Sequence, residues 1–213
     1  AAGNHKLSTI AAVLEVKSTN LTKYLKTLMD LDILERRVPV TEENPEKSKR
    51  GLYKIKDNYL RFWFAFIYPN MSFIESGHSG IVMDKIRRGL TTSHIGFVYE
   101  DICQERMWEL NVNNAWPFQF SQLGGYWDAK NEIDIAALDP EGKNLILGEC
   151  KYWKEPVGLN VLHALEAKAC DVAWERDRRK VWYVLFSISG FSDELRNHAA
   201  TREDLLLIDD GER

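Results

Sequence analysis

The residues best suited to chemistry are an aspartate and a glutamate on two predicted strands, with a lysine two residues beyond the glutamate. Asp134 lies in the segment EIDIAAL, and Glu149 and Lys151 lie in LILGECKY. Side chains alternate between the two faces of a strand, so Glu149 and Lys151 share one face. Neighbouring strands lie about 4.8 Å apart, which brings Asp134 beside Glu149 if the two segments pair. The pattern therefore predicts two carboxylates and an ammonium group at one point of a sheet.

These groups are typical of a site for phosphodiester hydrolysis. Two carboxylates this close repel each other unless a cation joins them, and hard oxygen ligands favour Mg²⁺ or Mn²⁺. Such a metal polarises a phosphoryl oxygen and acidifies a water, while a lysine orients that water and offsets developing charge. Glu100, near the middle of a predicted helix over residues 92–111, is placed to supply a third oxygen.

Each of these signals also has a structural interpretation. An E-x-K on a strand is usually an exposed ion pair, and a strand aspartate between isoleucines commonly faces solvent. The case for a metal site depends on the ordered set, in which a helix glutamate precedes Asp134, and Glu149-x-Lys151 follows fifteen residues later before another helix. The pattern alone leaves both a functional metal site and a structural charge pair open.

The elements that must position these residues indicate an α/β domain. The helix over 92–111 is expected to bury Phe97, Ile102 and Met107. Predicted elements then follow in this order: strands at 118–123, 132–138 and 145–152, a helix at 158–175, an apolar strand at 181–188, a helix at 191–200 and a strand at 204–209. The order α-β-β-β-α-β-α-β favours a mixed sheet flanked by helices.

The first part of the chain has the outline of a winged helix-turn-helix. Residues 7–14 place apolar side chains at helical spacing, with Ser8 as the expected cap. Residues 19–30 repeat the pattern, with Leu21, Tyr24 and Leu25 facing inward. Two β-like runs, at 33–40 and 50–55, enclose a polar loop that is typical of a wing.

Positive charge is concentrated in this first part. Residues 1–66 contain 12 Lys and Arg against 8 Asp and Glu, a net charge of +4, and the remainder has 16 against 24, a net charge of −8. This asymmetry suggests a basic module that could contact phosphate, and the mixed charge of the wing predicts weak, non-specific and salt-sensitive DNA binding. The candidate phosphate contacts lie on the second helix and the wing: Lys23, Lys26, Arg36, Arg37, Lys49 and Arg50. The competing interpretation is a solvated face on a domain that only holds partner domains together.

Residues 57–70, DNYLRFWFAFIYPN, surround Arg61 with aromatic side chains on every face of a predicted helix. A helix that is apolar all round is usually buried between domains, and base stacking is the alternative. Gly77, Ser79 and Gly80 follow, so we expect the domain boundary between 70 and 80. The predicted organisation is a winged-helix domain with its aromatic helix over 1–70 and an α/β domain over 71–213.

Composition excludes several classes of protein. The three cysteines are odd in number and lack CxxC spacing, which argues against a disulfide framework or structural zinc and favours a reducing cytoplasm. The longest apolar stretch, residues 60–68, is about half of the roughly 20 residues that a bilayer span needs, so no membrane segment is expected. The first residues lack a secretion signal and an initiator Met, which favours a piece of a longer protein. No P-loop GxxxxGK[ST] occurs, which excludes ATP hydrolysis by that route.

The ordered set Glu100, Asp134 and Glu149-Cys150-Lys151 resembles the PD-(D/E)XK nuclease superfamily. The chain also resembles the C-terminal region, known as DUF234, of archaeal and bacterial AAA-type ATPases. The similar segments are YLKTLMDLDILERRVPVTE, KSKRGLYKIKDNYLRFWFAFIYPN, EIDIAAL and GECKYW, and the likeness covers nearly the whole chain. Asn58 and Ala65 depart from this pattern, in which proline and arginine are common at those positions.

The resemblance implies a restriction endonuclease-like fold and a role for each residue of the set. Asp134, Glu149 and the main-chain carbonyl of Cys150 would bind the metal, Glu100 would bind it through a water, and Lys151 would be the catalytic lysine.

On the helix that follows, His163 and Lys168 lie where such nucleases often place an auxiliary polar residue. His163 is the candidate for that role, although a histidine on the surface of a helix is the more common case.

Two hypotheses of different classes follow from these observations. The first is a metal-dependent DNA endonuclease whose cutting is coupled to an N-terminal AAA-type ATPase domain outside this chain, with assembly into a homo-oligomer left open. The second is a catalytically inactive DNA-binding or ATPase-regulatory module that retains the nuclease fold. The acidic set disfavours a third reading, a plain winged-helix transcription regulator.

Overall fold

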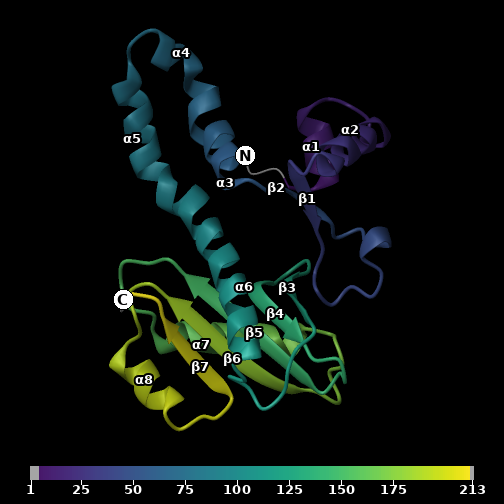
Figure 1. The fold of residues 1–213 in the computed structure, drawn as a ribbon, viewed down its shortest axis with the longest axis vertical. Helices are drawn as coiled ribbons and strands as arrows, with labels where there is room; N and C mark the ends of the chain where they lie inside the picture. The colour runs from purple at the N-terminus through teal and green to yellow at the C-terminus, as the bar shows by residue number, and fades with distance from the viewer. Residues whose placement is uncertain (1–4, 212–213) are drawn as a thin grey trace. The chain divides into compact units, whose positions relative to one another are not determined.

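The computed structural model describes residues 5–211, apart from the side chains of Thr92 and Ser93, and consists of two compact units (Figure 1). The first unit comprises Ala1–Val38 and Glu42–His94, and the second comprises Pro39–Thr41 and Ile95–Arg213. Within the described residues, no helix is long and apolar enough to cross a membrane.

The first unit begins with two helices and an antiparallel hairpin, in the predicted order. These elements are α1 (Leu7–Val13), α2 (Ser18–Asp30), β1 (Leu34–Arg37), the short 3-10 helix η1 (Pro45–Lys47) and β2 (Leu52–Ile55). Leu21 and Leu25 of α2 are buried in a small core, whereas Tyr24 is 67% exposed because α2 buries only a narrow stripe. The expected cap at Ser8 is wrong, since Lys6 occupies the cap position and no side chain caps α1.

A run of helices follows and reaches the boundary between the units. They are α3 (Asn58–Phe62), the π-helix η2 (Trp63–Ile67), the 3-10 helix η3 (Tyr68–Asn70), α4 (Met71–Glu75), α5 (Ser79–Leu90) and the π-helix η4 (Thr91–Ile95). Phe66, Val82 and Ile86 are buried together, which ties α5 to η2. The division between the units therefore falls at His94, later than the expected 70–80, where Gly77 with φ +80° only ends α4.

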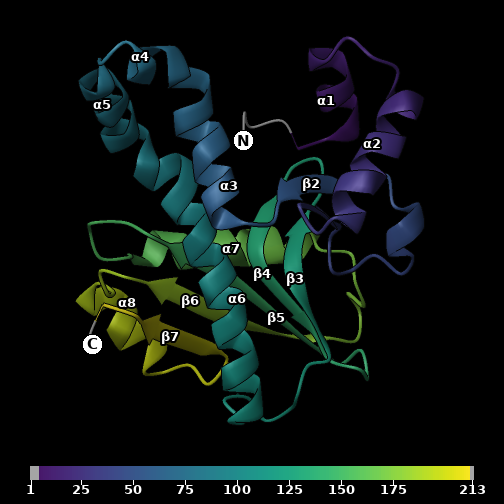
Figure 2. The ribbon, with the colours of Figure 1, turned by 45° about the horizontal axis from the view of Figure 1, so that its top comes forward.

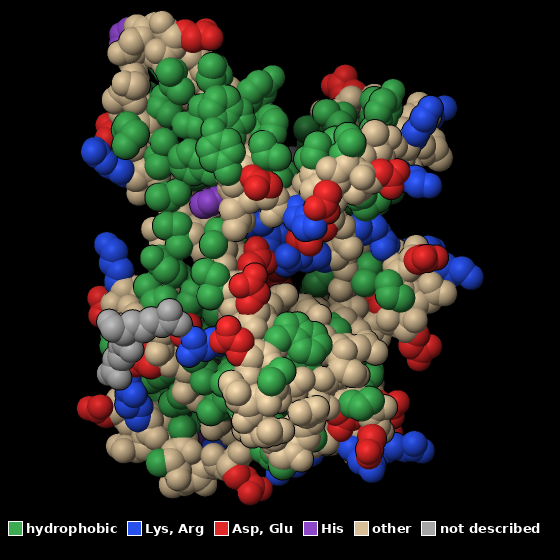
Figure 3. Space-filling view, viewed as in Figure 1, with side chains coloured by type: hydrophobic (Ala, Val, Ile, Leu, Met, Phe, Trp, Pro, Cys, Tyr) green, Lys and Arg blue, Asp and Glu red, His purple; other side chains and the backbone are tan. Residues whose placement is uncertain are grey.

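The aromatic side chains of α3, η2 and η3 are not all buried, contrary to expectation. Phe66 is buried, but Tyr59, Phe64 and Tyr68 are 66%, 41% and 62% exposed. Figure 3 shows hydrophobic side chains gathered on the surface over this helical run. The reason is geometric, because α4 and α5 cover only one side of the aromatic helix.

The second unit is built on a five-stranded mixed sheet, as predicted (Figure 2). Its strands, in spatial order, are β3 (Gln122–Trp127), β4 (Glu132–Leu138), β5 (Asn144–Lys151), β6 (Lys180–Ser187) and β7 (Leu205–Asp209). The pairs β3–β4 and β4–β5 are antiparallel, and β5–β6 and β6–β7 are parallel. The first strand starts later than the expected residue 118, because the Asn111 side chain bonds both the N–H and the carbonyl of Phe120 in place of a sheet partner.

Helices cover both faces of this sheet. Helix α6 (Gly96–Val112) packs on one face, where Met107 joins a core with Ile146, while Phe97 and Ile102, expected to be buried, are 39% and 50% exposed. Helices α7 (Leu159–Asp171) and α8 (Asp193–Ala199) supply buried residues to the core of the other face, which includes Leu165 of α7. The layered arrangement confirms the predicted mixed sheet flanked by helices, and it leaves the ends of β4 and β5 under α7.

Candidate functional site

The register of β4 and β5 places Asp134 directly across from Glu149. Ile135 pairs with Gly148 in the antiparallel ladder, so the next position outward pairs Asp134 with Glu149. On the other side of β4 the register shifts between Gly124 and Tyr126, so that one residue of β3 opposes two of β4, as in a β-bulge. A β-bulge changes the direction of the side chains within it, and Asp134 lies in this one.

Gly148 allows β5 to approach β6 closely just before the buried Glu149. A Cβ atom at Gly148 would lie 2.6 Å from the Val184 side chain and 2.9 Å from the Val184 carbonyl oxygen. Only glycine fits this close approach of β5 to β6. Glu149 follows it with 5% of its surface exposed, so its carboxylate is buried on the sheet face that α7 covers.

The predicted acidic pair and lysine lie together in the structure. The Cys150 N–H donates to Asp134 Oδ2 at 2.8 Å. Lys151 Nζ donates to Glu149 Oε2 and lies 3.6 Å from Asp134 Oδ2. Lys151 thus bridges the two carboxylates, and its ammonium also lies 5.7 Å from the centre of the half-exposed Trp153 ring.

A second lysine, from α7, completes this cluster. Lys168 Nζ donates to Glu149 Oε1 at 2.6 Å and to the Glu132 carbonyl oxygen at 2.7 Å. His163, predicted for the auxiliary role, is exposed on α7. Of the two α7 candidates, Lys168 is therefore the one that reaches the acidic pair.

Burial and charge act differently on the two carboxyl groups. Burial and the neighbouring Glu149 raise the pKa of Asp134 from 3.8 to about 6, and the Lys151 ammonium and the Cys150 N–H only partly oppose this. Burial also disfavours ionised Glu149, but the ammonium groups of Lys151 and Lys168 outweigh it and lower the pKa of Glu149. Glu149 is therefore favoured as the anion of the pair, whereas the positive groups around Asp134 only partly offset the cost of burying it in ionised form.

Glu100 does not come from the same side of the sheet as Asp134 and Glu149. It is on α6, which packs on the face of the sheet opposite to α7, and its carboxylate is close enough to Cys150 to help raise the pKa of that thiol, which burial raises most. The Cys150 thiol itself is packed in the α6-side core, as predicted. Among residues 5–211, no three His, Cys, Asp or Glu side chains are grouped closely enough to hold a metal. A water-mediated role for Glu100 stays a prediction.

The predicted phosphate contacts of the first unit fall into two groups. Lys23, Lys26 and Lys49 are exposed. The arginines instead make contacts within the unit: Arg36 donates to the Pro45 and Ser48 carbonyl oxygens at 2.7 and 2.6 Å, Arg37 pairs with Glu35, and Arg50 pairs with Glu42. Arg36 in particular anchors the loop between β1 and β2.

Comparisons with known proteins give the family of the chain. Residues 63–169 match the model of the DUF234 family, described as "Archaea bacterial proteins of unknown function". An uncharacterised protein of Methanocaldococcus jannaschii is 41% identical over 153 residues, which are 72% of this chain and 34% of that protein. The chain thus spans about a third of the length of this curated relative.

Among solved structures, the crystal structure of a repair endonuclease from Pyrococcus abyssi matches at 14% identity and a TM-score of 0.31, covering 48% of this chain and 44% of that one. A TM-score this low transfers no property to this protein, so the site rests on its own geometry. The family match extends over half of the chain and includes Asp134, Glu149, Lys151 and Lys168. This protein therefore belongs to the DUF234 family.

Proposed function

We propose that the second unit is a metal-dependent phosphodiesterase that cuts DNA at the site formed by Asp134, Glu149 and Lys151. The observation that carries this proposal is the convergence of two buried carboxylates and one ammonium group at paired positions of β4 and β5. A purely structural ion pair would not need a second carboxylate whose pKa is raised by burial and by the first carboxylate.

The donor set fits a hard divalent cation. Asp134 and Glu149 offer carboxylate oxygens from adjacent strands, and the Cys150 carbonyl follows Glu149 directly in the chain. The unfavourable burial of ionised Asp134 beside Glu149 is the situation that a cation relieves. Bound there, Mg²⁺ or Mn²⁺ would polarise a phosphoryl oxygen and acidify a water.

The remaining groups of the site have roles of their own. The Cys150 N–H holds Asp134 Oδ2 in place, and Lys151 is held near both carboxylates, where its ammonium can offset charge on a phosphoryl oxygen. Trp153 presents a half-exposed ring next to that ammonium, a surface on which a base can stack. In the first unit, Lys23 and Lys26 on α2 are available to phosphates.

The proposed activity is tested by nicking of supercoiled plasmid with Mg²⁺, Mn²⁺ or EDTA. Wild-type protein should nick only with metal, and Glu149→Gln and Lys151→Met should each lose about 10²-fold or more of the rate. The matched control is Lys180→Met, which removes an exposed lysine paired with Glu203 at 3.1 Å. Nicking that survives Glu149→Gln, or that Lys180→Met also abolishes, contradicts the proposed site.

A catalytically inactive module is the second candidate, and one observation favours it. Both oxygens of Glu149 already accept hydrogen bonds from ammonium groups, so the cluster of Asp134, Glu149, Lys151 and Lys168 is balanced in charge without a metal. This candidate predicts DNA binding without nicking and no change in melting temperature with Mg²⁺ or Mn²⁺. Coupling to an ATPase in a longer protein is part of either proposal.

A further inference from the structure

The position of Lys168 bears directly on how a cation reaches Glu149. Its ammonium donates to Glu149 Oε1 at 2.6 Å while Lys151 donates to Oε2, so each carboxylate oxygen faces a different lysine. A second bond to the Glu132 carbonyl oxygen, at 2.7 Å, holds Lys168 over β4 as well as β5. An ammonium group thus occupies the place next to Glu149 that a cation needs.

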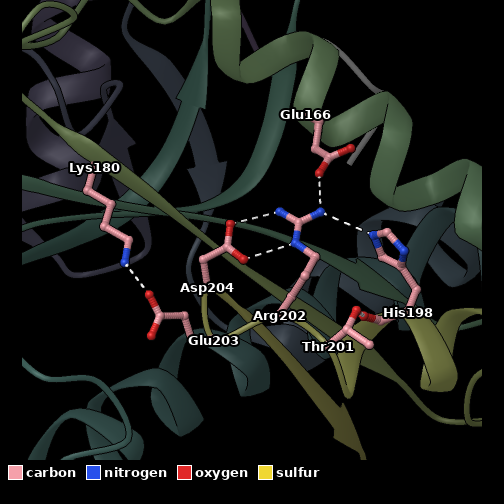
Figure 4. A network of polar contacts seen from close by, with 7 residues as sticks. All are labelled: Glu166, Lys180, His198, Thr201, Arg202, Glu203 and Asp204. Atoms are coloured by element: carbon pink, nitrogen blue, oxygen red, sulfur yellow. Dashed lines mark hydrogen bonds and ion pairs between the residues drawn. The ribbon is translucent and has the colours of Figure 1, made fainter.

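The helix that carries Lys168 is anchored from several directions. Arg202 pairs with Glu166 of α7 and with Asp204 ahead of β7, and it lies 3.3 Å from His198 Nε2 (Figure 4). Arg179 donates to the Ala169 carbonyl oxygen at 2.9 Å, near the C-terminal end of the same helix. Because α7 is held in this way, the backbone of Lys168 is fixed, and only its flexible side chain is free to leave Glu149.

The charges of the cluster show why one ammonium group has to leave. Two carboxylates and two ammonium groups balance, so a divalent cation added to the intact cluster would meet two like charges at close range. Lys151 extends from β5 itself and also faces Asp134. Lys168 has the more exposed side chain, 29% against 19% for Lys151, so moving it into water costs less.

We infer that Lys168 is a built-in counter-ion that competes with divalent cations for Glu149. This inference rests on the proposed function, because it assigns Glu149 to metal binding. In the metal-free protein Lys168 neutralises Glu149, and it swings away from Oε1 when a divalent cation binds. Metal affinity is therefore weaker than the carboxylates alone would give.

The test is Mn²⁺ binding by titration calorimetry, on wild-type protein and on Lys168→Met, Lys168→Gln and Lys168→Arg. Methionine and glutamine remove the charge, and we expect each to tighten Mn²⁺ binding by about tenfold to a hundredfold. Arginine keeps the charge and should leave binding weak. Lys180→Met serves as the control, because it removes a lysine of the same unit whose ion-pair partner is the exposed Glu203 and not Glu149.

Equal or weaker Mn²⁺ binding by both Lys168→Met and Lys168→Gln overturns the inference, provided that circular dichroism shows at least one of them folded in EDTA. If wild type binds no Mn²⁺ but the neutral variants do, the inference is supported, because the lysine alone was blocking the site. If wild type binds Mn²⁺ and nicks DNA, and the neutral variants bind Mn²⁺ equally well, this inference is wrong but the proposed function is supported. If none of the four proteins binds Mn²⁺, both the inference and the proposed function are wrong.

Discussion

Asp134→Asn is expected to stabilise the metal-free protein. Burial and Glu149 raise the pKa of Asp134 from 3.8 to about 6, so the folded state prefers the neutral acid. A rise of this size corresponds to about 3 kcal/mol at pH 7, where the unfolded chain carries an ionised aspartate. Asparagine mimics the neutral acid and keeps an oxygen that can accept from the Cys150 N–H.

The direction of the pH dependence follows from the raised pKa. An aspartate whose folded pKa is raised costs stability above about pH 6, and this cost disappears as the pH falls through 6 towards 3.8. Asp134→Asn should therefore gain up to about 3 kcal/mol at pH 7.5 and much less at pH 4.5. Loss of the long contact to Lys151, at 3.6 Å, makes this figure an upper bound.

Urea unfolding in EDTA, followed by tryptophan fluorescence at both pH values, measures the effect. All tryptophans except Trp63 lie in the second unit, so the signal reports mainly on the unit that contains Asp134. Asp177→Asn, at an exposed aspartate of the same unit, is the matched control and should change little. An Asp134→Asn variant that is less stable than wild type at pH 7.5, or whose gain is the same at pH 4.5, would refute the reasoning.

Three further outcomes follow from the site and the first unit. At 10 mM Mg²⁺ or Mn²⁺ and a Kd of about 1 mM, the second unit should gain about 1.4 kcal/mol and melt about 3–6 °C higher, and Glu149→Gln should remove this shift in differential scanning fluorimetry. Lys151→Met should keep the metal-induced rise while losing nicking, and loss of both would assign Lys151 a structural role instead. Replacing Lys23, Lys26 and Lys49 together by alanine should reduce the slope of log K for DNA against log salt by up to about 3, as measured by fluorescence anisotropy. An unchanged slope would show that these three lysines do not contact DNA phosphates.

Local patterns in the sequence were sufficient to predict the sheet and the acidic pair. An alternating apolar run indicates a strand buried on one face, and a continuous apolar run indicates a strand buried on both faces. From such runs, four of the five strands of the sheet were predicted to within two residues of their limits. Because a strand side chain has only two possible faces, the spacing of Glu149 and Lys151 determined that they share one. Pairing of consecutive segments then brought Asp134 beside them.

Helix faces were harder to predict, because a helix can turn any side toward its partner. Tyr24 on α2 and Ile102 on α6 fit apolar periodicity, yet both are exposed, since each helix buries a different one of its sides. The same freedom left His163 and Lys168 on α7 undecided, and only the packing of α7 against β4 and β5 brought Lys168 to Glu149.

Arg36 shows the other limit of sequence reasoning. A positive charge on a wing predicts a phosphate contact. The sequence does not reveal whether the folded chain itself supplies hydrogen-bond acceptors for that charge. The loop between β1 and β2 offers the carbonyl oxygens of Pro45 and Ser48, and Arg36 binds them. Residue types and their periodicity thus determined which groups were available for chemistry and which strands carried them. Tertiary structure decided which charges meet, because contacts between distant residues depend on how helices and loops are placed in three dimensions.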